Sequence, residues 1–115
     1  MSAAPARVVL VGFMGAGKST VGAIVARRLG YGLEDMDRRI EARTGRKIAA
    51  IFREDGEDAF RAIELEEALK VAGLVRRVVA AGGGAFTRPA TRTALQEGAV
   101  TVYLRCSLDV LLARV

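Results

Sequence analysis

The chain has 115 residues, 51% of them hydrophobic, which excludes a disordered polypeptide and fits one folded domain with its own core. Its net charge of +5 comes from 18 Lys and Arg residues against 13 Asp and Glu residues. There is no histidine, which excludes His-zinc sites and histidine acid-base catalysis and leaves carboxylates, Lys, Arg and bound metal as the catalytic repertoire.

The sequence also disfavours membrane, secreted and nucleic-acid-binding proteins. Its apolar runs fall short of the ~18 residues that a membrane span requires, and residues 1–7 lack the apolar core of a signal peptide. Cys106 is the only cysteine, so no intrachain disulfide can form. The arginine pairs are dispersed and only two Tyr and four Phe could stack on bases, which favours a solvated basic surface that attracts small anions. We therefore expect a cytoplasmic protein with no membrane or nucleic-acid partner.

The first predicted element is a β-strand at 7–11, followed by a phosphate-binding loop. Residues 12–19 match G-x-x-x-x-G-K-S and lead into a helix expected over 18–29. The glycines let backbone N–H groups converge on a polyphosphate, and the helix dipole adds to them. Lys18 would reach the β- and γ-phosphates, and the Ser19 hydroxyl would ligate Mg²⁺. We expect the nucleotide to be bound by Gly12, Met14, Gly15, Ala16, Gly17, Lys18, Ser19 and Thr20.

The later elements continue an alternation of strands and helices. Val21, Ile24, Val25 and Leu29 recur at helical spacing and are expected to face a sheet, with Gly30 ending the helix. We then expect a strand at 32–35, two or three helices within 38–72, a strand at 77–81, a glycine turn, a helix at 89–97 capped by Thr87, a strand at 100–104 and a helix at 108–115. This order predicts an α/β fold with a parallel sheet covered by helices on both faces.

The helical segment that follows the second strand interrupts this alternation. Apolar residues from Ile40 to Leu69 supply its buried faces. Helices inserted after the carboxyl end of a strand lie over the crevice in which ligands bind in open α/β sheets. We therefore expect a second substrate there, in a single domain of residues 1–115 with a flexible tail at 1–6 and a substrate-binding insert at 37–72.

Polar and glycine-rich residues cluster where the predicted strands end. Asp35 and Asp37 share one face if the strand continues, and they would serve Mg²⁺ and a substrate hydroxyl; the alternative is an acidic surface turn. The triple glycine 82–84 would bring backbone N–H groups close to a ligand, or form a flexible turn. Arg61 could clamp a carboxylate in bidentate fashion, or pair with Glu57 or Glu64 on its own helix.

Taken together, the string DMDRRIEARTGRKIAAIFREDGEDAFRAIE between GFMGAGKSTVG and GGGAFTRP resembles shikimate kinases, over essentially the whole chain. The resemblance implies a three-layer α/β/α P-loop kinase fold and transfer of the ATP γ-phosphate to the 3-hydroxyl of shikimate, with Mg²⁺. Asp37 matches the aspartate that holds and deprotonates the hydroxyl, and Asp35 the one that positions Mg²⁺ through water. Arg61 matches an arginine that grips the shikimate carboxylate, Gly82, Gly83 and Gly84 match backbone that lines the ring, and Arg114 falls where an arginine stacks on adenine.

The sequence also departs from the family pattern. Glu34 occupies a strand position that is usually apolar, Leu33 stands where Phe is common, and Ala80 and Ala81 replace a hydroxyl residue that often precedes the glycines. Because the sequence ends at Val115, we expect four strands without the family's fifth strand and lid, and an apolar edge at 100–104 through which an otherwise monomeric chain could associate. The alternatives to shikimate kinase activity are a nucleotide-binding fragment with little or no turnover and another P-loop kinase for a small hydroxy acid.

Overall fold

The computed structural model describes residues 5–12 and 18–104. Its helices and strands agree with the predicted order to within two residues at most boundaries, and the expected helix at 108–115 lies outside the described residues. The elements, including one 3-10 helix (η1), are β1 (Arg7–Gly12), α1 (Lys18–Leu29), β2 (Gly32–Asp35), α2 (Met36–Thr44), α3 (Ile48–Asp55), α4 (Glu57–Ala72), β3 (Arg77–Gly82), η1 (Gly83–Thr87), α5 (Pro89–Gln96) and β4 (Ala99–Leu104).

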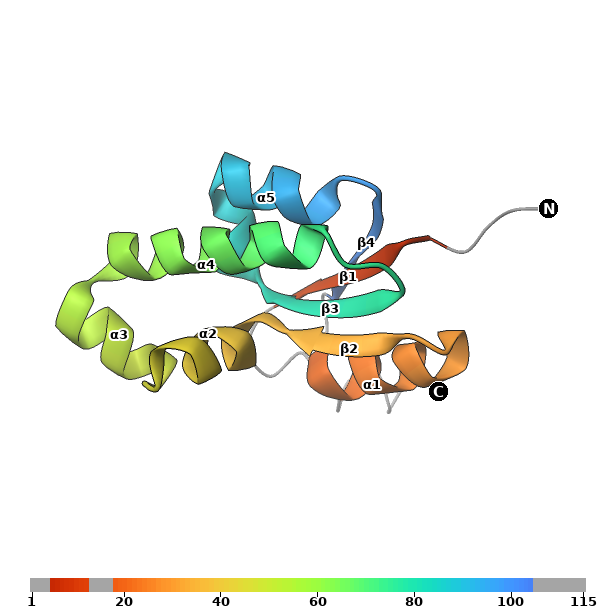
Figure 1. Ribbon diagram of the computed structural model, residues 1–115, viewed down its shortest axis with the longest axis horizontal. Helices are drawn as coiled ribbons and strands as arrows, with labels where there is room; N and C mark the ends of the chain where they lie inside the picture. Colours follow the sequence, from red (N-terminus) through yellow and green to blue (C-terminus); the bar gives the residue numbers. More distant parts are fainter. Residues whose placement is uncertain (1–4, 13–17, 105–115) are drawn as a thin grey trace.

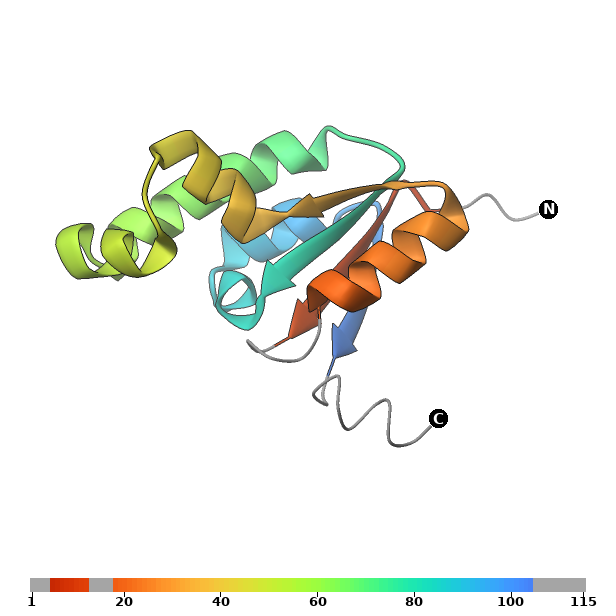
Figure 2. The same ribbon diagram turned by 90° about the horizontal axis from the view of Figure 1, so that it is seen from below.

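The four strands form one parallel sheet in the order β2-β3-β1-β4, which confirms the predicted α/β class. In Figure 2, α1 crosses one face of this sheet, while α4 and α5 lie behind the other. The register pairs Gly12 with Gly82 and Asp35 with Ala80. The carboxyl ends of the three neighbouring strands β1, β2 and β3 are therefore brought together at one edge.

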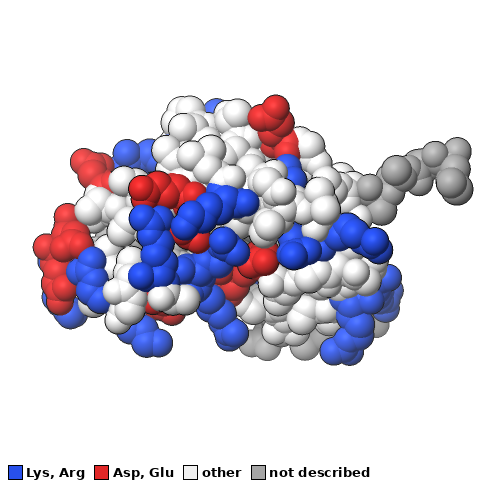
Figure 3. All heavy atoms as spheres, in the orientation of Figure 1, with Lys and Arg blue, Asp and Glu red and all other residues white. Residues whose placement is uncertain are grey.

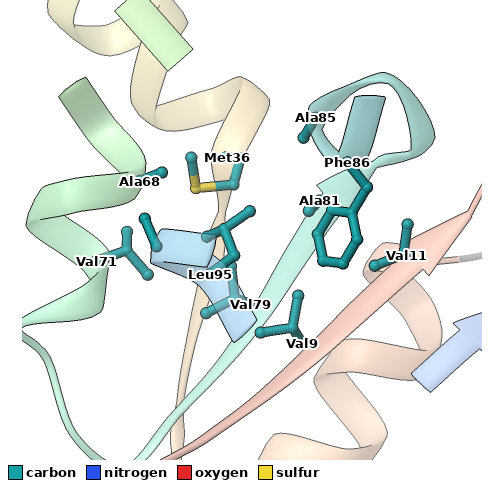
Figure 4. Packing of buried hydrophobic residues seen from close by; sticks show 11 residues of the cluster. Val9, Val11, Met36, Ala68, Val71, Val79, Ala81, Ala85, Phe86 and Leu95 are labelled. Carbon is teal, nitrogen blue, oxygen red and sulfur yellow. The ribbon is translucent and has the colours of Figure 1, made fainter. Parts of the chain in front are cut away.

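Alternate residues of the strands build a separate core on each face. Val9 and Val79 pack with residues of α4 and α5 on one side (Figure 4), whereas Leu10 and Val78 pack with Ala26 of α1 on the other. This is the two-residue period of a strand buried on both faces. It explains why β1 and β3 read as nearly continuous apolar runs.

The face by which α1 packs differs from the prediction. Val21 and Val25 do pack against the core beside Ala26, but Ile24 is 49% exposed and Leu29 is 39% exposed. The buried residues of this helix are Gly22 and Ala26. The small residues bring the helix close to the sheet, so the larger ones at its margin stay in solvent.

The predicted helical insert forms α2, α3 and α4, which extend beyond the sheet (Figure 1). Ile40, Ile51 and Phe60 make a third buried cluster that joins these helices, and the rings of Phe52 and Phe60 lie 4.7 Å apart. The expectation for Leu69 was wrong, since it is 59% exposed. The insert thus has a small core of its own, separate from the two faces of the sheet.

Glu34, the unusual acid on β2, is paired with arginines. Its carboxylate accepts from Arg39 at 2.9 Å and from Arg77 at 3.3 Å. Arg39 also binds Glu67 of α4 at 3.2 Å, and Glu67 forms two further ion pairs, with Arg43 and with Lys70. Figure 3 shows positive side chains gathered over this side of the molecule with acidic ones between them. These ion pairs tie β2 and α2 to α4.

Strand β4 lies at the other edge of the described sheet. Val100, Val102 and Tyr103 are 50%, 39% and 53% exposed, which agrees with the apolar edge expected at 100–104. Within the described part of the chain, no helix is both long enough and apolar enough to cross a membrane.

Candidate functional site

The amino end of α1 carries Lys18 and Ser19 to the edge where β1, β2 and β3 end. The Lys18 ammonium donates to the Gly12 carbonyl at 2.6 Å, which brings the side chain to the end of β1. Ser19 and Thr20 are exposed on the first turn of the helix. The loop residues 13–17, which include the expected nucleotide-binding residues Met14, Gly15, Ala16 and Gly17, lie outside the described residues, as does Arg114.

The two acids after β2 do not share a strand face, so that expectation was wrong. Asp35 is the last residue of β2 and the N-cap of α2, where its carboxylate accepts from the Arg38 backbone N–H at 3.2 Å. Asp37 already lies in the first turn of that helix. A helix can begin at Met36 because the carboxylate of the preceding residue, Asp35, accepts from an otherwise unpaired N–H of the first turn. The two carboxylates still interact electrostatically.

Asp35 and Ser19 make the oxygen pair expected of a metal site. The Ser19 hydroxyl donates to Asp35 Oδ2 at 3.2 Å. Described residues contain no group of three or more His, Cys, Asp or Glu that could hold a metal, but Mg²⁺ bound with a nucleotide needs only one or two protein oxygens besides phosphate and water. The pair opens onto a hollow of about 440 Å³, lined by Ser19, Leu33, Glu34, Asp35, Arg38, Arg39 and Ala42.

Asp37 has a raised pKa. The surrounding protein atoms displace part of its hydration water, and the Asp35 carboxylate adds repulsion, while Lys18 and Arg61 act in the opposite direction. The side chain keeps contact with solvent, so it is accessible to a ligand. The same carboxylate is thus within electrostatic reach of a cation from the phosphate-binding loop and a cation from α4.

Arg61 fits both of the alternatives that the sequence left open. Its Nη1 donates to Glu64 Oε1 at 2.8 Å, whereas Glu57 pairs with Arg88 instead. The guanidinium carbon lies 5.1 Å from the centre of the Phe60 ring and 5.9 Å from that of Phe52. Its Nε is buried and has no hydrogen-bond partner. The arginine is therefore held by its own helix and still has unused donors.

Glu64 is a buried acid, and the sequence suggested it only as one of two alternative partners for Arg61. Its side chain is 3% exposed. Burial raises the pKa of Glu64, and the hydrogen bond from Arg61 opposes that rise. The signal that could have assigned it was the three-residue spacing from Arg61 on one helix.

The triple glycine continues from β3 into η1 rather than forming an open turn. Gly82 ends the strand, and an added Cβ there would meet nothing within 4 Å, whereas a Cβ at Gly84 would collide with the Arg61 guanidinium. Thr87 does not cap α5 as expected; Arg88 holds that position, and the Thr87 hydroxyl donates to the Gly84 carbonyl at 2.7 Å. Of the glycines, Gly84 thus lies against Arg61, and the backbone role expected for Gly82 to Gly84 stays a prediction.

Comparison with known proteins identifies relatives over nearly the whole chain. The shikimate kinase family model matches residues 14–115. The shikimate kinase of Geobacter sulfurreducens is 50% identical over 107 residues, which are 93% of this chain and 59% of that protein. That of Salinibacter ruber is 46% identical over 111 residues, 96% of this chain and 54% of that protein. The chain thus spans a little more than half the length of these curated relatives.

Solved structures give the same result. Shikimate kinase from Acinetobacter baumannii in complex with shikimate superposes with a TM-score of 0.85 and 39% identity, over 96% of this chain and 61% of that one. Shikimate kinase from Bacteroides thetaiotaomicron superposes with a TM-score of 0.84 and 36% identity, over 96% of this chain and 63% of that one. With the family model matched across most of its residues, this chain belongs to the shikimate kinase family.

Proposed function

We propose that this chain transfers the γ-phosphate of ATP to the 3-hydroxyl of shikimate, the step that gives shikimate 3-phosphate in aromatic amino acid biosynthesis. The observation that carries the proposal is the position of Asp37. Its carboxylate interacts electrostatically with both Lys18 and Arg61. A base within electrostatic reach of a phosphate-binding cation and of a carboxylate-binding cation suits a substrate that has both a hydroxyl and an acid group.

In this proposal, Asp37 accepts the proton of the attacking hydroxyl. Its raised pKa makes it a stronger base than an ordinary aspartate, while its solvent contact leaves room for the substrate. Lys18 holds the β- and γ-phosphates and offsets the charge that grows on the transferred group. The loop glycines 12, 15 and 17, together with Met14, Ala16, Ser19 and Thr20, complete the nucleotide site, and Arg114 stacks on adenine.

Ser19 and Asp35 would hold Mg²⁺, Ser19 directly and Asp35 through water. Their oxygens lie 3.2 Å apart beside an open hollow, which fits an ion that keeps several water ligands. When bound, Mg²⁺ neutralises phosphate charge. The cap that Asp35 provides to α2 fixes the carboxylate at the edge of the sheet.

Arg61 would select an acid substrate. A guanidinium binds a carboxylate through two parallel N–H donors, and Arg61 has a buried Nε without a partner. The backbone of Gly82, Gly83 and Gly84 would line the ring of the same substrate. We further propose that residues 1–115 act as one cytoplasmic domain, monomeric in solution, with the insert 37–72 as its substrate-binding part.

A coupled assay of ADP release with and without shikimate tests the proposed reaction. We expect ADP release to depend on shikimate and on Mg²⁺. Arg61→Ala should raise the KM for shikimate much more than that for ATP, because the guanidinium contacts only the acid substrate. ATP binding without shikimate-dependent turnover would contradict the proposed reaction and favour a nucleotide-binding role. Turnover with a hydroxy compound that lacks an acid group would contradict the role of Arg61.

A further inference from the structure

We infer that Gly84 is a positioning residue for Arg61: its missing side chain makes the space in which the guanidinium lies, and so directs the Nε and Nη2 donors towards the carboxylate of the substrate. This inference rests on the proposed function for the identity of the ligand. The third glycine would then differ from Gly82, where an added Cβ would contact no side chain. Gly84 would position Arg61, and Arg61 would bind the ligand.

The three atoms nearest to the space beside Gly84 all belong to Arg61. A Cβ built on Gly84 would lie 2.9 Å from Cζ and 3.0 Å from Nη1 of Arg61, and closer still to Nη2. Real Cβ atoms are essentially never that close to other heavy atoms, so a methyl group here must displace the guanidinium. At Gly82 the same methyl would have no neighbour within 4 Å. The close approach is thus particular to one of the glycines.

The backbone of Gly84 does not itself require glycine. It lies in η1 and lacks the positive φ of Gly30, Gly45, Gly56 and Gly98. An alanine could adopt this conformation without strain. The requirement for a hydrogen at this position therefore comes from the contact with Arg61.

Other contacts of Arg61 restrain its guanidinium. The guanidinium carbon lies 5.1 Å from the centre of the Phe60 ring and 5.9 Å from that of the Phe52 ring, and Nη1 donates to Glu64 at 2.8 Å. With Nη1 used, the buried Nε and the neighbouring Nη2 are the edge that remains for a bidentate acid. A carboxylate bound at that edge would satisfy the buried Nε.

Two contacts restrain the backbone around Gly84. Within η1, the Thr87 hydroxyl donates to the Gly84 carbonyl at 2.7 Å, and just after η1, Arg88 binds Asp58 at the start of α4 at 3.0 Å. We therefore expect a methyl group at Gly84 to displace the Arg61 guanidinium, the end of a flexible side chain, before it displaces the backbone.

A double-mutant cycle between Gly84→Ala and Arg61→Ala tests the inference. Affinity is measured by calorimetry for shikimate and for its carboxamide, which lacks the negative charge. We expect Gly84→Ala to reduce the preference for shikimate over its carboxamide about 10- to 100-fold, the range of a charged hydrogen-bonded contact. In the Arg61→Ala background, Gly84→Ala should cause no further loss of this preference. An equal loss in both backgrounds would overturn the inference.

Two glycine variants serve as controls. Gly82→Ala adds the same methyl group to the same segment without a protein contact, so the preference for the acid over the carboxamide should persist even if the ring binds less well. Gly73→Ala tests the substitution far from the site, where the new Cβ makes only an ordinary contact. If Gly84→Ala does not fold, the comparison is made in Arg61→Lys, whose slimmer ammonium leaves room for the methyl. There Gly84→Ala should fold and cost nothing, and a further loss of acid binding would overturn the inference.

A measurement without substrate separates this inference from the proposed function. In the unmodified protein, the Nε–H proton of Arg61 should be protected from exchange with water, because Nε is buried. Gly84→Ala should remove that protection, and Gly82→Ala should not. If the protein shows no preference for shikimate over its carboxamide while Gly84→Ala still exposes this proton, the proposed substrate is wrong and the positioning role stands. Unchanged protection in Gly84→Ala would overturn the positioning role.

Discussion

The Ser19 hydroxyl donates a hydrogen bond to the Asp35 carboxylate across 3.2 Å, joining the start of α1 to the end of β2. Asp35 also caps α2 through the Arg38 N–H. One carboxylate therefore serves two neighbouring tasks, one in the proposed metal site and one in the local fold. The two tasks can be separated by substitution.

Asp35→Asn should keep the cap and lose the metal function, because asparagine caps helices as well as aspartate does but carries no charge. We expect Mg²⁺-dependent nucleotide affinity to fall about 10- to 100-fold, as measured by titration with and without the metal. Asp35→Ala should lose the cap as well, at a further cost of about 1 kcal/mol in the free energy of unfolding. Equal stability of the Asn and Ala variants would show that the cap contributes nothing.

Asp37→Asn should reduce shikimate-dependent turnover about 10²- to 10⁴-fold, the usual contribution of a general base. It should also stabilise the fold at neutral pH. The raised pKa of Asp37 means that the folded state holds its proton more tightly than the unfolded state, so stability falls as the pH rises from the ordinary value of 3.8 through the folded pKa. Asparagine avoids that loss.

Urea unfolding across this pH range measures the effect of Asp37→Asn, with Asp55→Asn as the control of opposite sign. The hydrogen bond from Arg46 lowers the pKa of Asp55, so its removal should destabilise the fold at neutral pH. A stability difference for Asp37→Asn that does not shrink below pH 3.8 would show that charge is not its cause.

Glu67→Gln should destabilise the fold by about 1 to 3 kcal/mol, because it leaves three cations around a buried neutral amide. Burial opposes ionisation of Glu67, but hydrogen bonds from Lys70 and Arg43 and the charge of Arg39 outweigh it and lower its pKa. Its stabilising contribution is therefore complete above the ordinary value of 4.5 and is lost as the pH falls through the lower folded pKa.

Chemical unfolding at neutral pH and at steps below pH 4.5 measures the contribution of Glu67. Glu66→Gln is the matched control, because Glu66 is 55% exposed and, among the described residues, pairs with Arg43 alone. We expect the control to change stability within experimental error. A similar loss in both variants would contradict the role of burial in the network.

Gly22 sets the distance between α1 and the sheet. Its Cβ would lie 3.0 Å from Cδ1 of Leu33, a half-exposed side chain on the edge strand that can shift. Gly22→Ala should therefore be neutral or stabilising by up to about 1 kcal/mol, since alanine favours the helix. Gly22→Leu should destabilise by about 1 to 3 kcal/mol through overpacking. Thermal unfolding checks both, and Ala23→Leu on the exposed face is the control for size alone.

The sequence predicted the order of the elements because their signals are local. The apolar runs of β1 and β3, the glycine that ends α1 at Gly30, and the phosphate-loop pattern each depend on neighbouring residues. Backbone geometry and short-range hydrogen bonds set these features, so they can be read without the fold.

The expectations that failed concern side-chain environments. Helical spacing alone placed Ile24 and Leu29 on the buried face, but close packing at Gly22 and Ala26 decided which side faces the sheet. The sequence likewise predicted that Leu69 is buried, but the side of α4 that carries it faces solvent. A periodic pattern predicts that a helix has an apolar face, but the element packed against the helix decides how many residues of that face are buried.

By itself, the sequence determined the α/β class, the phosphate-binding loop and the family, since these depend on residue types at fixed spacings. Only the tertiary structure decided that Glu34 of β2 pairs with Arg77 of β3 and that Gly84 makes room for Arg61 of α4. These pairs join residues far apart in the chain. Their distances depend on how β2, β3 and α4 pack, which no local pattern records.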